Sequence, residues 1–213
     1  MGIPYYFKFL CKKFPSCIRD FDEFILDKEI SELYFDLNGL IHPSCSLAKQ
    51  NNKDINNLEK EIISETIKNI LNIVKLVNPN KNITLAVDGV APFAKITQQR
   101  SRRYKSLLRK KKINKIYQEL KLDIDDWDTN MISPGTPFMD DLMKELHKNI
   151  NIFKNKPGVQ VSLYDSNIVG EGEQKIMKLI KNNINSGIRV IHGMDADLIM
   201  LSLLSNVDNI YLL

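Results

Sequence analysis

The sequence predicts an α/β fold with a mostly parallel central sheet flanked by helices. Short apolar runs typical of buried strands alternate along the chain with longer amphipathic segments typical of helices. The clearest strand covers residues 83–87, Ile-Thr-Leu-Ala-Val, and such uninterrupted apolar runs are typical of parallel sheets covered on both faces. No linker or composition change divides the 213 residues, so we expect one α/β unit over 1–213.

Two strands and three helices are predicted in the first half of the chain. Residues 4–14 form a short amphipathic pattern, and residues 33–37 form the first strand. Apolar residues recur at helical spacing over 56–77, and an Asn-Pro-Asn turn follows that helix. After the strand at 83–87, residues 95–120 predict a long helix.

The second half of the chain continues the alternation of helices and strands. An Asp-rich stretch predicts a loop, and a Ser-Pro-Gly-Thr turn marks the start of the helix after it. In chain order we predict a loop over 122–131, a helix over 138–153, a strand over 160–164, a helix from 170–173 to about 182, a strand over 188–191, a helix over 196–204 and a strand over 209–213.

The charge of the chain is concentrated in one region. The net charge is only +4, but residues 89–118 contain ten Lys or Arg and no acidic residue. The remainder of the chain is therefore net acidic. Such polarity is typical of proteins that bind polyanions, among which nucleic acids are the commonest.

The cysteines and the hydropathy pattern indicate the compartment. Cys11, Cys17 and Cys45 show no CxxC spacing and are odd in number, which argues against a zinc site and against a disulfide framework. No leader pattern and no apolar run of membrane-spanning length is present. We therefore expect a reducing, intracellular compartment and no membrane partner.

Six acidic residues occur where predicted strands end or predicted helices begin. The carboxyl ends of parallel strands open onto the ligand crevice of such sheets, so these side chains should gather there. Gathered carboxylates repel one another, and divalent ions with a preference for oxygen ligands, Mg²⁺ or Mn²⁺, would neutralise them. We call this set the acidic cluster: Asp36, Asp88, Glu171, Glu173, Asp195 and Asp197.

Each member of the acidic cluster also has a simpler explanation. Glu171 and Glu173 would be favoured at a helix start by the macrodipole alone. Asp197 could cap a helix, and Asp36 and Asp88 could initiate turns. Local turn and cap chemistry does not explain why all of them fall at three strand ends and one helix start, so together they favour a metal site.

A second group of residues predicts a phosphate pocket. Four residues lie on one side of the helix predicted over 95–120: Lys95, Gln99, Arg102 and Arg103. Arg side chains bind phosphate oxygens bidentately, so this grouping favours a phosphate ligand. The run over 109–112 points all round the helix and is more typical of a solvated face with weak, salt-sensitive attraction to nucleic acid.

The motifs taken together resemble the XRN family of 5′→3′ exoribonucleases. The resemblance extends over nearly the whole chain and follows the order of the family's motifs. The acidic layout is shared with flap endonucleases, whereas the Gln-Gln-Arg-Ser-Arg-Arg block is similar to XRN enzymes. The matching segments are 1–7, 34–42, 86–92, 94–95, 98–103, 133–136, 170–173, 175–177 and 193–200.

The resemblance implies a fold, an activity and a role for each candidate residue. The fold would be that of PIN-like and flap-endonuclease-like nucleases, with the acidic cluster holding two Mg²⁺ or Mn²⁺ ions. Lys95, Gln99, Arg102 and Arg103 would bind the 5′-monophosphate of single-stranded RNA, and His42 would stack on the first base. The enzyme would release mononucleotides in RNA decay.

Family members have a second conserved region that is absent from 1–213. We expect a further segment or chain to complete the active site. Two other functions stay open: a flap-type nuclease acting on DNA, and a catalytically incomplete protein that binds RNA 5′ ends as a scaffold.

Overall fold

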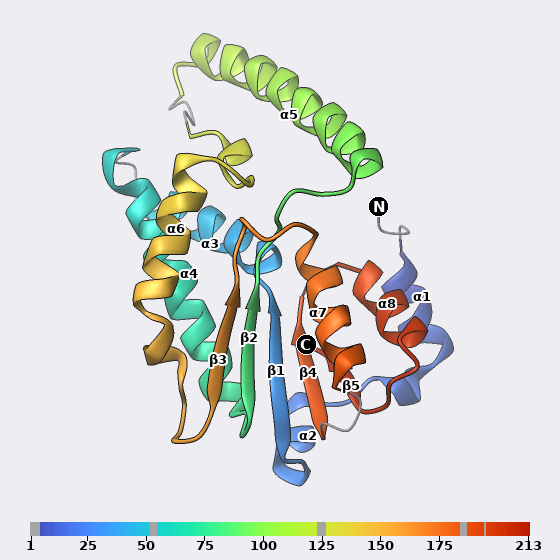
Figure 1. Cartoon of the computed structure of the whole chain (residues 1–213). Helices are drawn as coiled ribbons and strands as arrows, with labels where there is room; N and C mark the ends of the chain where they lie inside the picture. The colour runs from blue at the N-terminus through green and yellow to red at the C-terminus, as the bar shows by residue number, and fades with distance from the viewer. Residues whose placement is uncertain (1–4, 52–54, 123–126, 184–186, 194) are drawn as a thin grey trace.

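A five-stranded sheet, parallel throughout, forms the centre of the molecule in the computed structural model (Figure 1). The structure describes residues 5–51, 55–122, 127–183, 187–193 and 195–213. The strand order is β3-β2-β1-β4-β5. The predicted α/β fold is therefore confirmed. The strands are β1 (Ile30–Asp36), β2 (Asn82–Ala86), β3 (Gln160–Tyr164), β4 (Ile188–His192) and β5 (Ile210–Leu212).

The central strand β1 is buried over its whole length. Leu33 and Phe35 pack into the larger core on one face of the sheet, while Tyr34 packs into a smaller core on the other face, as the two-residue period of a strand requires. The register pairs Asp36 with Ala86 of β2 and Phe35 with His192 of β4. The carboxyl ends of these three strands therefore lie at one edge of the sheet.

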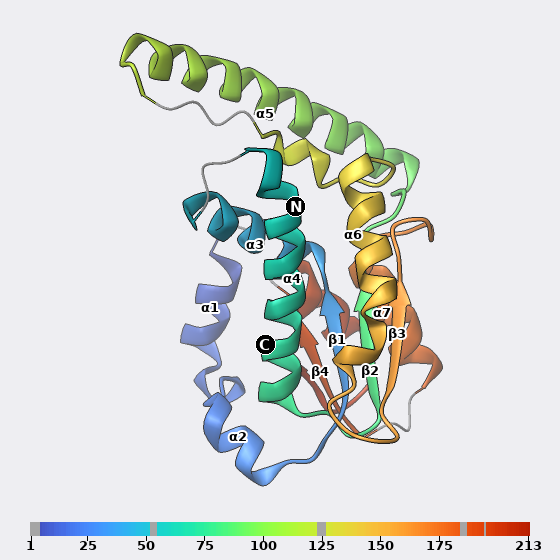
Figure 2. The same cartoon turned by 90° about the vertical axis from the view of Figure 1, so that its left-hand side faces the viewer.

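Helices cover both faces of the sheet (Figures 1 and 2). One face is covered by α3 (Asn38–Asn51), α4 (Ile55–Val77) and α6 (Pro137–Lys148), and the other by α7 (Gly172–Asn182) and α8 (Asp197–Leu204). Because both faces are covered, the strands can be apolar on both sides, which is why the sequence shows uninterrupted apolar runs.

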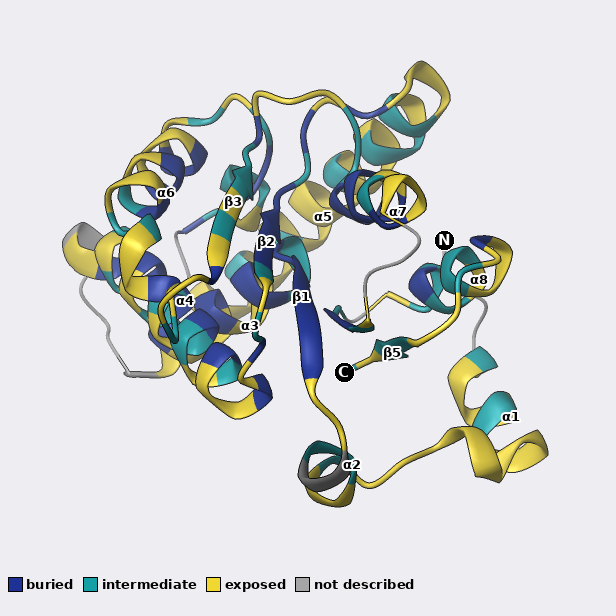
Figure 3. Cartoon of the chain, turned by 60° about the horizontal axis from the view of Figure 1, so that its bottom comes forward, coloured by how far each residue is buried: buried dark blue, intermediate teal, exposed yellow. Residues whose placement is uncertain are grey.

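Helix α5 (Phe93–Glu119) arches over the carboxyl end of the sheet and has no buried residue (Figures 1 and 3). Its far half is held by Lys110, whose Nζ donates to the carbonyl of Trp127 over 2.9 Å. A helix this exposed gains little stability from core packing, so most of its positions can carry basic residues without loss of buried apolar contacts.

Two helices were not predicted from the sequence. Helix α2 (Phe21–Asp27) begins at Asp20, whose carboxylate accepts the backbone N–H groups of Asp22 and Glu23. Helix α3 contains Pro43 and follows a strand without a break, so its local pattern predicts a turn. It is stabilised by burial of its apolar face against α4, through Leu40, Ile41, Cys45 and Ala48.

Several predicted boundaries need correction. Strand β1 begins at Ile30 and not at residue 33. The apolar pattern placed the start too late because the strand contains a polar residue, Glu32, which is buried. The helix predicted over 138–153 is wrong as one element: α6 ends at Lys148 and a 3-10 turn, η3 (Ile150–Phe153), follows.

The remaining elements agree with the predictions to within a few residues. Helix α1 (Tyr6–Lys13) is followed by η1 (Pro15–Cys17). The predicted loop over 122–131 includes 123–126, which lie outside the described residues, and ends in η2 (Thr129–Met131). Among the described residues, no helix combines the length and hydropathy needed to cross a membrane.

Trp127, to which the sequence analysis assigns no role, is part of the core. It is buried, its ring meets Phe138 edge-on at 5.4 Å, and its indole Nε1 donates to Glu59 over 3.1 Å. Through these contacts Trp127, which lies between α5 and α6 in the chain, packs against both α4 and α6. A buried indole with its N–H satisfied is a structural anchor.

Candidate active site

The acidic cluster gathers at the carboxyl end of the sheet. Asp36 is the last residue of β1, Asp88 follows β2, and Glu171 and Glu173 lie at the start of α7. Asp195 follows β4, and Asp197 is the first residue of α8. All of these except Asp197 line a cavity of about 960 Å³, which we call the carboxyl-end pocket.

Asp36 is the most buried aspartate of the cluster, with 8% of its surface exposed. Its Oδ1 atom is buried and has no hydrogen-bond partner among the described residues. Burial, followed by repulsion from Asp88 and Asp195, raises the pKa of Asp36 to about 7. An unpartnered buried carboxylate oxygen facing other carboxylates is a position that a cation would stabilise.

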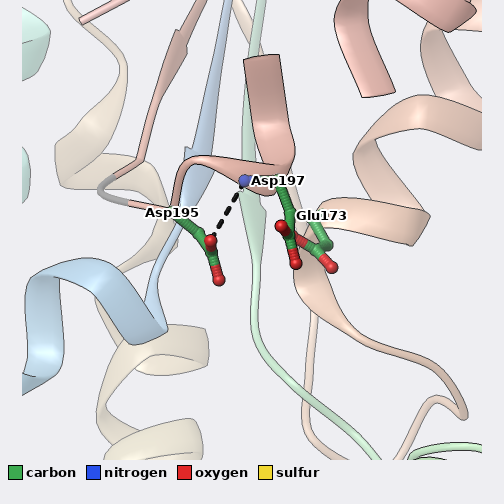
Figure 4. Close-up of side chains that lie close together, drawn as sticks. All are labelled: Glu173, Asp195 and Asp197. Carbon is green, nitrogen blue, oxygen red and sulfur yellow. Dashed lines mark hydrogen bonds between the residues drawn. The ribbon is translucent and has the colours of Figure 1, made fainter. Parts of the chain in front are cut away.

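Three carboxylates of the cluster lie close enough to share an ion (Figure 4). Oxygen atoms of Glu173, Asp195 and Asp197 all lie within 4.8 Å of one another. Asp195 Oδ1 also accepts the backbone N–H of Asp197 over 3.0 Å. Glu173 is buried, and burial followed by the charge of Asp195 raises its pKa to about 7.

The first turn of α7 approaches the acidic cluster closely. The backbone N–H of Gly172 donates to Asp88 Oδ1 over 2.7 Å. A Cβ at Gly172 would lie 2.9 Å from Asp36 Oδ1 and 3.2 Å from the carbonyl of Ala86, so only glycine permits this approach. The positive end of the helix dipole thus faces Asp36 and Asp88 and favours their ionised forms.

The simpler capping explanations do not account for the cluster. Glu171 occupies the N-cap position of α7 without a side-chain cap hydrogen bond. Ala196, and not Asp197, is the N-cap residue of α8. The side chain that serves the first turn of α7 comes from Asp88, far away in the sequence.

Asn38 and Lys175, for which no role was predicted from the sequence, hold Asp88 in place. Asn38 Oδ1 accepts the backbone N–H of Asp88 over 3.1 Å. Lys175 is buried, and its Nζ donates to the carbonyls of Val87 over 2.6 Å and Asp165 over 2.9 Å. Burial lowers the pKa of Lys175, while the nearby Asp88 and Asp165 act against that shift. The sequence feature that could have indicated this role of Lys175 is its position one helical turn after Glu171, on the inward face of α7.

The four predicted phosphate-binding residues, which we call the α5 quartet after the helix that carries them, line the same carboxyl-end pocket as the acidic cluster. Lys95, Gln99, Arg102 and Arg103 lie on the first three turns of α5, where that helix passes above the ends of the strands. The predicted phosphate-binding residues and the predicted metal ligands therefore share one cavity. That meeting depends on the direction of α5, which the sequence does not reveal.

His42 lies on α3 and also lines the carboxyl-end pocket. Loss of solvation, and next the positive charge of Arg102, lower the pKa of His42. A neutral imidazole that is accessible from the pocket has a flat face suited to stacking on a base.

Lys95 links the two groups of residues. Its Nζ lies 3.1 Å from Glu171 Oε1 in an ion pair. Desolvation alone would lower the pKa of Lys95, but the hydrogen bond and the charge of Glu171 raise it. Through this ion pair the α5 quartet contacts the acidic cluster directly.

A wall of the pocket was not anticipated from the sequence. It is formed by Thr129, Asn130, Ser133 and Pro134. Asp128 accepts the backbone N–H of Asn130 over 3.0 Å and so shapes this turn. The Ser-Pro-Gly-Thr signal at 133–136 predicted a helix start but gave no indication of a place at the site.

Comparison with known proteins identifies the family. The sequence model described as "XRN 5'-3' exonuclease N-terminus" matches residues 1–213. The chain belongs to the XRN exonuclease family. It is 33% identical to 5'-3' exoribonuclease 2 of Aspergillus fumigatus and 32% identical to that of Saccharomyces cerevisiae, over 95% of this chain in each case. It is 33% identical to the 5'-3' exoribonuclease 2 homolog of Drosophila melanogaster over 98% of this chain.

The chain spans about a quarter of the length of these XRN relatives, covering 23%, 24% and 27% of them respectively. Membership of an exonuclease family and the buried acidic cluster together indicate a need for a divalent metal ion. The residues present fit such an ion, because the donors are all oxygens and Asp36 Oδ1 lacks any other partner among the described residues.

Proposed function

We propose that this chain is the nuclease region of a metal-dependent 5′→3′ exoribonuclease that releases mononucleotides from 5′-monophosphorylated RNA. The observation that carries the proposal is that one cavity contains both the acidic cluster and the α5 quartet. Cleavage of the first linkage requires that the 5′ end and the reacting phosphodiester be held side by side. A single pocket with a basic wall and an acidic floor supplies both positions.

In this proposal the acidic cluster holds two Mg²⁺ or Mn²⁺ ions. When bound, such a pair supplies activation of a water molecule and stabilisation of the leaving oxygen, so no side-chain nucleophile is needed. Asp36 and Glu173 contribute buried carboxylates that have few other partners, and Asp195 and Asp197 contribute accessible ones. Asn38 and Lys175 keep Asp88 in register with them.

The α5 quartet anchors the 5′-monophosphate. The guanidinium groups of Arg102 and Arg103 and the ammonium of Lys95 neutralise its charge, and Gln99 donates a further hydrogen bond. A 5′-hydroxyl end would bind weakly because it lacks that charge, and a triphosphate or cap would be too large. His42 stacks on the first base and sets its position above the cluster.

A further segment or chain would complete the site in this proposal. Support comes from the XRN relatives, which extend well beyond the region that this chain matches. No disulfide bond joins Cys11, Cys17 or Cys45 among the described residues, and we propose a reducing intracellular compartment for the protein.

The test is a cleavage time course on single-stranded RNA with Mg²⁺ or Mn²⁺. Three substrates differ only in the 5′ end: monophosphate, hydroxyl or triphosphate. We expect mononucleotides from the monophosphate substrate alone. Lys95→Ala combined with Arg102→Ala should erode that preference, with a matching Lys111→Ala variant on the exposed far half of α5 as control.

Other outcomes of the same assay assign other functions. Endonucleolytic cleavage of DNA flaps would indicate a flap-type nuclease and overturn the proposal. Tight, monophosphate-selective binding without release of nucleotides, if it persists when the following region of the protein is included, would make the chain a reader of RNA 5′ ends.

A further inference from the structure

Lys95 has two competing partners in the carboxyl-end pocket. It points from α5 into the pocket, where Gln99, Arg102 and Arg103 also lie. Yet its Nζ is paired with Glu171 Oε1 at 3.1 Å, and both side chains are partly buried, at 28% and 16% exposure. An ion pair shielded from solvent in this way is stronger than one at an open surface.

This pairing reduces what each partner can offer to a ligand. While Glu171 accepts from Lys95, the ammonium is partly neutralised, and a phosphate entering the pocket meets a carboxylate directly behind it. While Lys95 donates to Glu171, that carboxylate is in turn less available to a cation. The other members of the α5 quartet show no such ion pair among the described residues.

We propose that Glu171 is a specificity-determining residue that makes recognition of the 5′-monophosphate depend on the divalent cation. In the metal-free protein Glu171 holds Lys95 away from the phosphate. A cation bound at the acidic cluster would compete with Lys95 for the carboxylate of Glu171 and so release Lys95 to the 5′-phosphate. The inference rests on the proposed function, since it takes the metal and phosphate positions from it.

The coupling must act in both directions. If a cation improves phosphate binding by releasing Lys95, a 5′-phosphate at Lys95 must improve cation binding by the same factor, because linked equilibria are reciprocal. The protein would then engage 5′-monophosphate ends firmly only when it is loaded for cleavage, and a metal-free protein would not retain them.

The first experiment measures RNA binding in EDTA, where no cleavage occurs. Fluorescence anisotropy compares short RNAs with a 5′-monophosphate and with a 5′-hydroxyl at pH 8. We expect Glu171→Gln to raise the preference for the monophosphate by about fivefold over the unmodified protein, the worth of one such ion pair. Glu173→Gln is the matched control, since it removes the same charge nearby and acts on Lys95 through charge alone.

The second experiment measures the reverse effect without RNA. Calorimetric titration with Mn²⁺ compares the unmodified protein with Lys95→Met and with Arg103→Met. We expect Lys95→Met to bind Mn²⁺ about fivefold more tightly, because Glu171 is then released. Arg103→Met removes a positive charge from the same pocket but not the partner of Glu171, so its affinity should change less.

The outcomes separate this inference from the proposed function. Equal effects of Glu171→Gln and Glu173→Gln on RNA preference, or of Lys95→Met and Arg103→Met on Mn²⁺ affinity, would overturn the inference while leaving the proposed function intact. If no variant prefers the monophosphate with or without metal, the phosphate pocket itself is misplaced, and the proposed function fails with it.

Discussion

A carboxylate is buried near each end of β1, and the two carboxylates differ in whether the protein supplies a cationic partner. Near the amino end, Glu32 is 1% exposed and pairs with Arg189 at 3.3 Å. Tyr34 donates to the same oxygen of Glu32 over 2.8 Å, and Asn82 and Asn183 donate to the other over 2.9 and 3.2 Å. Arg189 reaches further to backbone carbonyls, including that of Asn183.

At the carboxyl end, four residues away on the same strand, Asp36 has no comparable partner. Its Oδ1 is unsatisfied among the described residues, and the charges that raise its pKa are those of other carboxylates. The same fold therefore supplies a protein cation at one end of the strand and leaves the other end short of one. The difference indicates that the structural carboxylate is Glu32 and that Asp36 is arranged for a ligand.

The largest expected effect comes from removing the charge of Asp36. We expect Asp36→Asn to lower cleavage at least about a thousandfold, since several kcal/mol of metal-derived stabilisation depend on the cluster. In EDTA its melting temperature should stay level or rise, because repulsion is relieved. RNA binding should be spared. Cleavage assays and thermal melts on the same preparation measure both, and retained cleavage would remove Asp36 from the metal site.

The matching change at the other end should reverse the pattern. Glu32→Gln leaves the guanidinium of Arg189 buried without its partner, so we expect a loss of about 3 kcal/mol in the free energy of unfolding. Chemical denaturation measures it. The double variant Glu32→Gln with Arg189→Met should regain part of the loss, because no buried charge remains. A Glu32→Gln protein as stable as its parent would show that the pair is dispensable.

A smaller effect is expected from the buried lysine behind Asp88. Lys175→Met keeps the bulk but removes the donor to Val87 and Asp165, so Asp88 should be held less well. We expect Mn²⁺ affinity to fall about tenfold, as is typical when a residue supporting a metal ligand is lost. Lys178→Met, exposed on the same helix, is the control. Unchanged Mn²⁺ affinity would limit Lys175 to packing.

The smallest expected effect is a dependence of metal stabilisation on pH. The pKa values of Asp36 and Glu173 are raised to about 7, whereas unfolded carboxylates titrate near 4. The stability they confer without metal is thus fully present below about pH 4 and is lost as pH rises to about 7. A cation must displace those protons, so Mn²⁺ should raise the melting temperature by a few degrees more at pH 8 than at pH 6.

Thermal melts with and without Mn²⁺ at the two pH values provide the measurement. Glu173→Gln cannot release a proton from that position and should show a smaller difference between the two pH values. An equal Mn²⁺ shift at pH 6 and pH 8 in the parent protein would contradict the link between these two carboxylates and the ion.

Local pattern was enough to predict the parallel sheet and the place of the acidic cluster. A continuous apolar run such as 83–87 is compatible with few structures other than a buried strand, and acidic residues after such runs must lie at its carboxyl end. The α5 quartet followed from helical spacing alone. These inferences needed only neighbours within a few residues, which a sequence shows directly.

The tertiary structure decided everything that depends on distant partners. Helix α3 persists despite Pro43 because α4 covers it, and no local signal reports that cover. Asp88 is held by Asn38, 50 residues before it, while the Lys175 contact to Val87 spans 88 residues. Whether a buried Glu or Asp receives a protein cation or is left for a ligand depends on such contacts. The sequence alone therefore located the carboxylates, and only the fold distinguished Glu32 from Asp36.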